Sequence, residues 1–241
     1  MNTSIQLARF FKKVFIFSKL HVLFSPFENI FRNAAYLSRL SKFANAHKGK
    51  IPFNDFPLRK FDYNKREKLY QYLLDTQIHT SDIQYLEFGV CGGSSFKWWV
   101  DQHKNANSTF HGFDTFEGLP EDWGPFKKGA MGTNSLPPNI TDSRVQFHKG
   151  LFQQTFPQFT QQISTTTKKI IHLDADLYSS TLYILTSIAP YLKQGDIILF
   201  DEFLVPTHEF LAYDNFVKSY YINMELIAAA NNYYFTAFKI Q

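Results

Sequence analysis

The chain has 241 residues, of which 44% are hydrophobic and 19% charged, so it has enough apolar side chains for a substantial core and is not expected to be disordered. The formal net charge is +4 and the basic residues form no dense run, so nucleic acid is not an expected partner. The single cysteine, Cys91, excludes an intramolecular disulfide, argues against a cysteine zinc site and fits a reducing compartment; we expect a cytoplasmic protein.

The first 25 residues predict an amphipathic basic helix. Apolar residues fall at helical spacing from Leu7 to Phe15, and the basic residues, among them Lys12 and Lys13, lie mostly on the other side. The lysines leave no uncharged stretch near the ~20 residues of a spanning helix, and no small-residue cleavage site follows. Two interpretations stay open: attachment to an anionic membrane surface, or packing on the protein's own domain or a partner subunit, which is the commoner fate of such helices and is favoured.

The chain up to about residue 80 reads as helices and loops. A Ser-Pro start signal at residues 25–26 and a glycine at Gly49 delimit one helix, and residues 64–77 form a charged amphipathic second helix. Between them, residues 51–63 contain two prolines and alternating aromatic residues, which predicts an irregular segment. We therefore expect an N-terminal helical extension over residues 1–80.

After residue 80, short apolar runs alternate with helical segments. The expected strands cover residues 83–88, 108–113, 144–149, 169–174 and 196–200, and residues 221–240 predict two more strands around an Asn-Asn turn, as an antiparallel hairpin. This alternation predicts an α/β domain over residues 81–241, with a doubly wound, mostly parallel sheet.

In such a sheet the ligand binds beyond the carboxyl ends of the strands, where the strand order reverses. The first expected strand ends in "EFGVCGG", which matches neither the GxGxxG dinucleotide fingerprint nor a phosphate loop. Glu87 before Gly89, Gly92 and Gly93 suits a ligand with a cationic amino-acid part, such as S-adenosylmethionine. Asp114 ends the next strand, where an acidic residue accepts hydrogen bonds from both ribose hydroxyls.

A second acidic group follows the later strands. Asp174 and Asp201 end two strands 27 residues apart, a spacing that one crossover accommodates, and Asp176 and Glu202 lie beside them. A hard divalent cation would relieve the repulsion among four carboxylates, and oxygen ligands favour magnesium, manganese or calcium over zinc. The alternative for Asp176 is that it caps the following helix.

From residue 81 the chain resembles class I S-adenosylmethionine-dependent methyltransferases, and within them the macrocin O-methyltransferase (TylF-like) family of metal-dependent sugar O-methyltransferases. The motifs that carry the resemblance are "YLEFGVCGGSS", "GFDTFEGLPEDW", "VQFHKGLFQQTFP" and, most specifically, "DADLYSST" followed by "GDIILFDEF".

The resemblance implies a seven-stranded sheet, with S-adenosylmethionine and Mg²⁺ or Mn²⁺ as cofactors. It makes Asp174 a metal ligand, Asp176 the general base, and Asp201 and Glu202 the rest of the metal site, although Glu202 replaces an aspartate and Phe203 a tyrosine. It also implies that residues 1–80 help form the acceptor pocket and contacts in a homo-oligomer. The expected cofactor-binding residues are Glu87, Gly89, Gly92, Gly93, Ser94, Asp114, Gly150, Phe152 and Asp174.

We therefore expect an enzyme that transfers a methyl group to a hydroxyl of a sugar or glycosylated small molecule. Residues 121–143 would be either a lid over the site or an idle surface loop. His111, His148 and His172 lie in strands, where structural histidines are commoner than catalytic ones. The alternative enzyme is a metal-dependent glycosyltransferase that uses a nucleotide-sugar through "DAD", and the non-enzymatic alternative is a membrane-peripheral protein.

Overall fold

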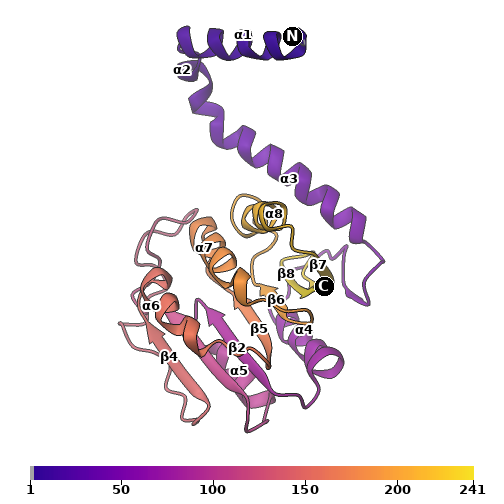
Figure 1. The fold of residues 1–241 in the computed structure, drawn as a ribbon, viewed down its shortest axis with the longest axis vertical. Coiled ribbons are helices and arrows are strands. Elements are labelled where there is room, and N and C mark those ends of the chain that lie inside the picture. The colour runs from indigo at the N-terminus through magenta and orange to yellow at the C-terminus, as the bar shows by residue number, and fades with distance from the viewer. Residues whose placement is uncertain (1–2) are drawn as a thin grey trace.

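The computed structural model describes residues 3–241 as a central sheet covered by helices on both faces, with a helical arm at the N-terminus (Figure 1). The strands are β1 (Phe53–Asn54), β2 (Ile83–Phe88), β3 (Thr109–Asp114), β4 (Val145–Lys149), β5 (Lys168–Leu173), β6 (Ile197–Phe200), β7 (Met224–Ala230) and β8 (Phe235–Ile240). The α-helices are α1 (Thr3–Phe17), α2 (His21–Phe24), α3 (Glu28–His47), α4 (Lys65–Leu73), α5 (Ser94–Gln102), α6 (Phe152–Phe159), α7 (Tyr178–Ile188) and α8 (Glu209–Tyr220). Short 3₁₀ or π turns are η1 (Ser25–Phe27), η2 (Leu74–Ile78), η3 (Thr160–Gln162) and η4 (Ala189–Tyr191).

The strand order is β1-β7-β8-β6-β5-β2-β3-β4, and β8 runs antiparallel to both of its neighbours while the other pairs are parallel. The chain moves outward from β2 through β3 to β4, then returns to place β5 on the other side of β2. This confirms the doubly wound, mostly parallel sheet. The sheet has eight strands because the segment expected to be irregular contributes β1, whose Phe53 and Asn54 pair with Ala228 and Ala229 of β7.

Alternation along the strands divides the core between the two faces of the sheet. In β5, Ile171 and Leu173 face one cluster while Ile170 faces the other, because successive side chains of a strand point to opposite sides. Helices α6, α7 and α8 cover the first face, and α4 and α5 cover the second. Both faces of the central strands are therefore buried, which explains why β6 is a continuous apolar run and β2 a largely apolar one.

The predicted hairpin is confirmed as β7 and β8. Its turn residues Asn231, Asn232 and Tyr233 all have positive φ angles, a conformation that asparagine tolerates better than most residues. The backbone N–H groups of both asparagines donate to the Asp55 carboxylate, at 3.0 and 3.2 Å. This contact ties the segment around β1 to the far end of the chain.

The N-terminal arm stands away from the sheet (Figure 1). No residue of α1 is buried, and α3 buries only Leu40 and Ala44, both near its carboxyl end. The segment that stands away thus ends near Arg39, just before Leu40 joins the core, and well before residue 80, since α4 also buries Leu69 and Tyr70. Within residues 3–241 no single helix is long and apolar enough to span a membrane; α1 and the helix from His21 to His47 meet that test only together, across a 79° bend.

Candidate active site

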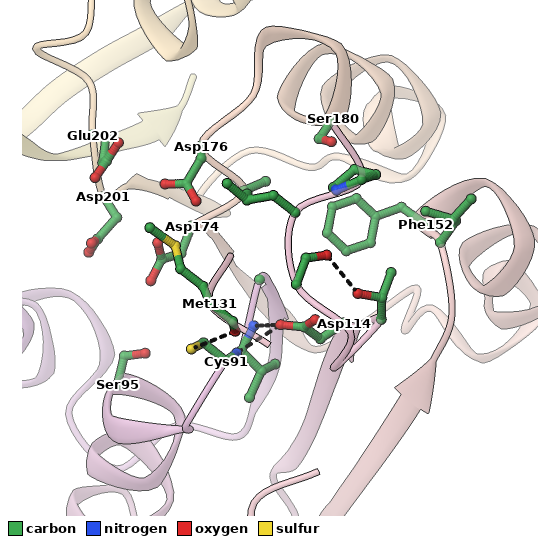
Figure 2. Close-up of a pocket in the computed structure, with 18 of the residues that line it drawn as sticks. Cys91, Ser95, Asp114, Met131, Phe152, Asp174, Asp176, Ser180, Asp201 and Glu202 are labelled. Carbon is green, nitrogen blue, oxygen red and sulfur yellow. Dashed lines mark hydrogen bonds between the residues drawn. The ribbon is translucent and has the colours of Figure 1, made fainter. Parts of the chain in front are cut away.

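A cavity of about 810 Å³ opens where the strand order reverses, at the carboxyl ends of β2, β3, β5 and β6. Its wall includes nine of the residues that the sequence singled out: Gly89, Gly92, Ser94, Asp114, Phe152, Asp174, Asp176, Asp201 and Glu202. The four later acidic residues gather on one side, while Asp114 and Phe152 lie on the other (Figure 2). Glu87, Gly93 and Gly150 lie outside this wall.

The three glycines after β2 have three different roles. Gly89 has φ +94°, and a Cβ there would lie 1.8 Å from the carbonyl oxygen of Asp174, so β2 and β5 can meet this closely only through a glycine. Gly93 has φ +78°, and its Cβ would lie 2.4 Å from Pro138. Gly92 has no left-handed φ, and no described atom lies within 4 Å of where its Cβ would be. Gly92 is thus the glycine that the protein's own packing does not require.

Asp114 fastens the glycine turn to the end of β3. One carboxylate oxygen accepts the N–H groups of Val90 and Cys91, each at 2.8 Å, and the other accepts the N–H of Phe116 at 2.7 Å. A carboxylate offers about four acceptor positions, so one remains for a ligand. Asp114 therefore keeps acceptor capacity for a ribose hydroxyl while it holds the glycine turn.

Glu87 is fully buried behind the glycine turn. Its carboxylate accepts hydrogen bonds from the hydroxyls of Ser95, at 2.7 Å, and Tyr85, and it lies 3.3 Å from Nδ1 of His172. The side chain was expected to contact the cofactor, but in the structure it holds the start of α5 and the end of β5 together. Ser94, which was also expected to bind the cofactor, does face the cavity.

Ionisation of three of the four clustered acids is suppressed. Burial, followed by repulsion from Asp201, raises the pKa of Asp174 well above its usual value and raises that of Asp176 as well. Burial and the charge of Asp176 raise the pKa of Glu202. The Glu202 carboxylate accepts a hydrogen bond from Tyr234 at 2.7 Å, but its Oε2 is buried with no hydrogen-bond partner in residues 3–241. The cluster thus has more acceptor capacity than the described residues satisfy.

Asp176 does not cap the helix that follows it. Leu177 occupies the position before α7, and no side chain caps that end. Asp176 itself has φ +59°, a left-handed conformation that costs a non-glycine residue about 1 kcal/mol or more. The helix-cap alternative therefore does not account for this aspartate, whose strained backbone and raised pKa are typical of functional positions.

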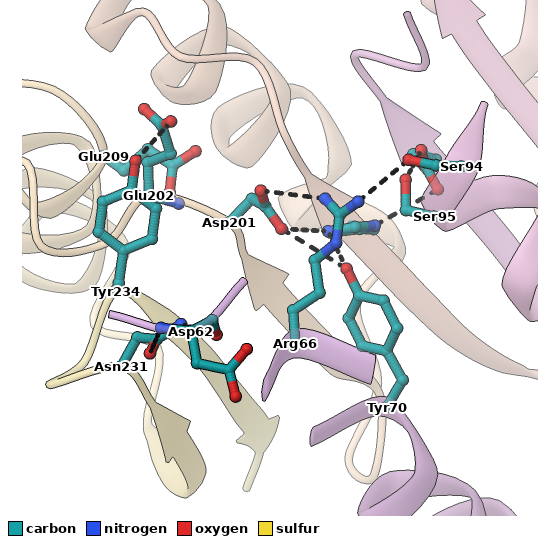
Figure 3. A network of polar contacts seen from close by, with 12 residues as sticks. Asp62, Arg66, Tyr70, Ser94, Ser95, Asp201, Glu202, Glu209, Asn231 and Tyr234 are labelled. Carbon is teal, nitrogen blue, oxygen red and sulfur yellow. Dashed lines mark hydrogen bonds and ion pairs between the residues drawn. The ribbon is translucent and has the colours of Figure 1, made fainter. Parts of the chain in front are cut away.

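Asp201 is neutralised by residues outside the expected set. Arg66 of α4 lies 3.5 Å from its carboxylate and donates to Ser94 Oγ at 3.0 Å, while Tyr70 donates to Asp201 at 3.5 Å (Figure 3). Arg66 is only 6% exposed. The sequence holds only a partial signal for Arg66: residues 66, 69, 70 and 73 share one side of α4 at helical spacing, and a charged residue on a buried side needs a buried partner, but the spacing does not say which partner.

After Arg66, His172 is the second cation that offsets the charge of Asp201. Burial alone would lower the pKa of His172, but hydrogen bonds to Asp201 and Glu87 raise it to about 10, so the ring is protonated at neutral pH. One of its nitrogens and an oxygen from each of Asp174 and Asp201 lie within 4.8 Å of one another, a spacing that would suit a metal. A protonated imidazole has no lone pair to offer, so His172 acts here as a counter-ion. The structure thus gives His172 a supporting role, in which its charge holds Asp201 and Glu87 in place beside the cavity.

The segment after Asp114 lies against the cavity. Pro120, Glu121 and Met131 contribute to its wall, and Ser179 of α7 donates to Glu121 at 2.8 Å. The thiol of Cys91 lies 3.3 Å from the carbonyl oxygen of Met131. The loop therefore touches both the glycine turn and α7, which are two sides of the cavity, and the alternative of an idle surface loop does not describe it.

The residues after β4 complete the wall on the Asp114 side. Phe152 faces the cavity and packs edge-on against Phe88, with ring centroids 5.5 Å apart. Gly150 has φ +143° and donates its N–H to the Asp114 carbonyl at 2.9 Å, but its surface faces a neighbouring cavity. Of this expected pair, Phe152 alone lies where it can contact a ligand in the main cavity.

Comparison with known proteins shows which enzymes this chain resembles. Residues 86–203 match a family model described as "Methyltransferase domain". The crystal structure of CalS11, calicheamicin methyltransferase, is similar over 86% of this chain and 91% of that chain, with a TM-score of 0.56 and 20% sequence identity. The structure of the O-methyltransferase NovP is similar over 86% and 98%, with a TM-score of 0.56 and 19% identity. No curated protein sequence matches the chain. The fold is that of class I methyltransferases, and the match over residues 86–203 together with these structures indicates an enzyme that transfers a methyl group.

Proposed function

We propose that the protein is an S-adenosylmethionine-dependent O-methyltransferase that acts on a hydroxyl of a sugar or glycosylated small molecule with the help of Mg²⁺ or Mn²⁺. One observation carries the proposal: a single cavity has the glycine turn and Asp114 on one wall and, on the other, the clustered carboxylates of Asp174, Asp176 and Glu202, of which Glu202 keeps a buried oxygen without a hydrogen-bond partner in residues 3–241. A methyl donor and a hydroxyl acceptor could therefore lie side by side.

The solved structures with similar folds agree with this substrate class. CalS11 is described as a TDP-rhamnose 3'-O-methyltransferase, and that structure has a TM-score of 0.53 and 20% identity to this chain. NovP is described as an O-methyltransferase. The macrocin O-methyltransferase resemblance of "DADLYSST" and "GDIILFDEF" points the same way. The glycosyltransferase alternative gives no role to the glycine turn, and the family match favours methyl transfer.

The residues fit a hard divalent cation. Arg66 and His172 together offset about the charge of Asp201 and Glu87, which leaves Asp174, Asp176 and Glu202 without a cation. The cavity donors at this side, including Asp201, which stays on the cavity wall although Arg66 and His172 offset its charge, are all carboxylate oxygens, the ligands that Mg²⁺ and Mn²⁺ prefer. Asp174, Asp201 and Glu202 would hold the ion, which, when bound, would supply Lewis-acid stabilisation of negative charge on the acceptor oxygen.

The chain's own residues would do the rest. Gly92, Ser94 and Asp114 would hold the methyl donor, which supplies an electrophilic methyl group on a cationic sulfur. Asp176 would accept the proton of the acceptor hydroxyl, because its raised pKa brings its basicity closer to that of a proton acceptor working near neutral pH. The loop residues Pro120 and Met131 would limit water in the cavity, which favours a reaction that consumes opposite charges.

Isothermal titration calorimetry tests the choice of donor. The purified chain is titrated with S-adenosylmethionine and, separately, with UDP-glucose, each with Mg²⁺ and with EDTA. We expect S-adenosylmethionine to bind under both conditions, whether or not UDP-glucose also binds, because a nucleotide-sugar could occupy the acceptor site. Metal-dependent binding of UDP-glucose together with no binding of S-adenosylmethionine would favour the glycosyltransferase alternative.

Turnover tests the metal and the acceptor class. Methyl transfer to a panel of nucleotide-sugars and glycosides is followed by mass spectrometry with Mg²⁺, Mn²⁺ or EDTA. We expect activity that EDTA abolishes and Mg²⁺ restores. An Asp174→Asn variant should lose this metal-dependent activity and keep its affinity for S-adenosylmethionine; full activity in that variant or in EDTA would exclude the metal from the reaction.

A further inference from the structure

The N-terminal arm, defined here as residues 3–31, exposes apolar side chains that no part of the described chain covers. No residue of α1 is buried. Leu7, Phe10 and Phe11 on α1 are 56, 60 and 61% exposed, and Leu23 and Phe24 on α2 are 64 and 42% exposed. An apolar surface this long is rare on a monomeric protein in water and marks a surface of interaction. The described residues therefore show no packing of α1 on the protein's own domain; packing on a partner subunit, the other part of that sequence-based interpretation, stays open.

Most of the net charge of the protein also lies on the arm, whose only acidic residue is Glu28. Residues 1–27 contain four basic residues, Arg9, Lys12, Lys13 and Lys19, and no aspartate or glutamate, whereas the other 214 residues contain 21 basic and 21 acidic residues. On α1, Leu7, Phe10, Phe11 and their neighbours form one face, and Lys12 and Lys13 lie outside it. Positive charge beside a continuous apolar face is the composition of helices that lie in the headgroup region of anionic bilayers.

The geometry of the arm suits a flat surface. The axes of α1 and the following helix meet at 79°, so α1 lies crosswise at the far end of α3 (Figure 1). Aromatic contacts hold this bend: Phe15 stacks on Phe24 at 5.5 Å, and Phe24 lies 6.5 Å from Phe31. The Leu20 N–H also donates to the Phe15 carbonyl at 3.1 Å. Phe15 of α1 and Phe24 of α2 thus join the apolar side chains of the two helices, and α3 connects them to the catalytic body.

We propose that the arm docks the enzyme on an anionic lipid surface, with α1 lying in the plane of the interface. Helix α1 has 15 residues and is about 22 Å long, shorter than the ~30 Å hydrocarbon core, and its lysines favour the headgroup region over the interior. Phenylalanines of α1 and α2 enter the acyl boundary, while the basic side chains contact lipid phosphates. Helix α3, about 30 Å long, then holds the active site above the surface.

The charge pattern favours lipid over a second copy of this chain. Two arms packed on each other would bring eight basic residues together with no acidic residue in residues 1–27 of either chain to offset them. An anionic membrane offers the opposite charge along with an apolar interior. The inference concerns the arm alone and does not depend on which donor, metal or acceptor the active site uses.

Co-sedimentation with vesicles tests the proposal on the full-length protein. The probes are vesicles of phosphatidylcholine alone and vesicles with about one third phosphatidylglycerol. We expect binding to the anionic vesicles that weakens as salt rises from 0.1 to 0.5 M. A Lys12→Glu/Lys13→Glu variant should partition at least about 30-fold less, because each basic residue near an anionic surface contributes about 1 kcal/mol.

Two further variants make the test specific. Lys97→Glu/Lys104→Glu changes the net charge equally, at exposed lysines of the catalytic body, and should bind anionic vesicles within about 2-fold of the parent protein. Phe10→Ser/Phe11→Ser should lose binding while keeping all the charge. The proposal is overturned if the two double lysine variants lose binding equally, if the parent protein does not bind anionic vesicles, or if sedimentation velocity shows an arm-dependent dimer that ignores vesicles.

Discussion

Substitution of Gly92 by alanine separates a ligand-binding role from a structural one. Gly92 lies on the cavity wall, its φ is outside the left-handed region, and no described atom lies within 4 Å of the new methyl group. The protein itself therefore has room for the side chain, and loss of backbone freedom in the unfolded chain should make Gly92→Ala neutral or more stable by up to about 1 kcal/mol. A methyl group pressed into a close backbone-ligand contact should cost about 1–3 kcal/mol of binding.

The expected result is a dissociation constant for S-adenosylmethionine raised roughly 5- to 150-fold, with an unchanged or higher free energy of unfolding. Calorimetry measures the first quantity and urea denaturation the second. Gly89→Ala is the matched control: its φ of +94° and the Asp174 carbonyl oxygen, 1.8 Å from the new Cβ, should cause a large loss of stability. Unchanged affinity in a stable Gly92→Ala protein would refute the idea that a ligand approaches this glycine.

Asp176→Asn should lower kcat by about 100-fold or more and leave the dissociation constant of S-adenosylmethionine within about 2-fold, because the amide cannot accept the hydroxyl proton; wild-type kcat would exclude Asp176 as the base. Arg66→Met should lower the free energy of unfolding by about 3–5 kcal/mol in urea denaturation, because buried Asp201 loses its cation. The control, Arg39→Met, breaks the more exposed pair with Asp214 and should cost under about 1 kcal/mol. Equal losses in the two variants would contradict this reasoning. Burial, then the nearby His148, lowers the pKa of His111 to about 4. Between pH 6.5 and pH 4 the unfolded chain therefore binds a proton at this histidine and the folded chain does not. The free energy of unfolding should fall by about 2–4 kcal/mol over this range because of this group. His111→Phe should flatten that part of the stability profile, and an unchanged slope would assign the loss to other groups.

Local sequence patterns were sufficient to predict the sheet. Short, largely apolar runs formed β2, β5 and β6, because both faces of a central parallel strand are buried and need no alternation. The Asn231-Asn232 pair marked the hairpin turn, since asparagine tolerates positive φ. These signals lie within a few residues of the feature that they predict. Strand β1 was missed because two residues give no periodicity and its pairing with β7 spans 175 residues of chain.

The candidate site was predictable in its acids and not in its counter-ions. Parallel strands end at one edge of the sheet, so Asp114, Asp174 and Asp201 had to converge once the strands were known. The sequence did not reveal that Glu87 turns behind the wall, because successive side chains of a strand point to opposite faces and the register of burial is set by the packing of α5.

The sequence by itself determined which segments form strands, the acidic residues at the strand ends, the glycine turn and the charge of the arm. Each of these depends on residue type and spacing along the chain. The tertiary structure alone decided which charges are offset. Arg66 and His172 reach Asp201 from elements distant in sequence, and their effect depends on burial, which strengthens every charge interaction. It also decided that the arm stands free of the body, because whether an amphipathic helix finds a partner depends on the surfaces that the rest of the fold leaves uncovered.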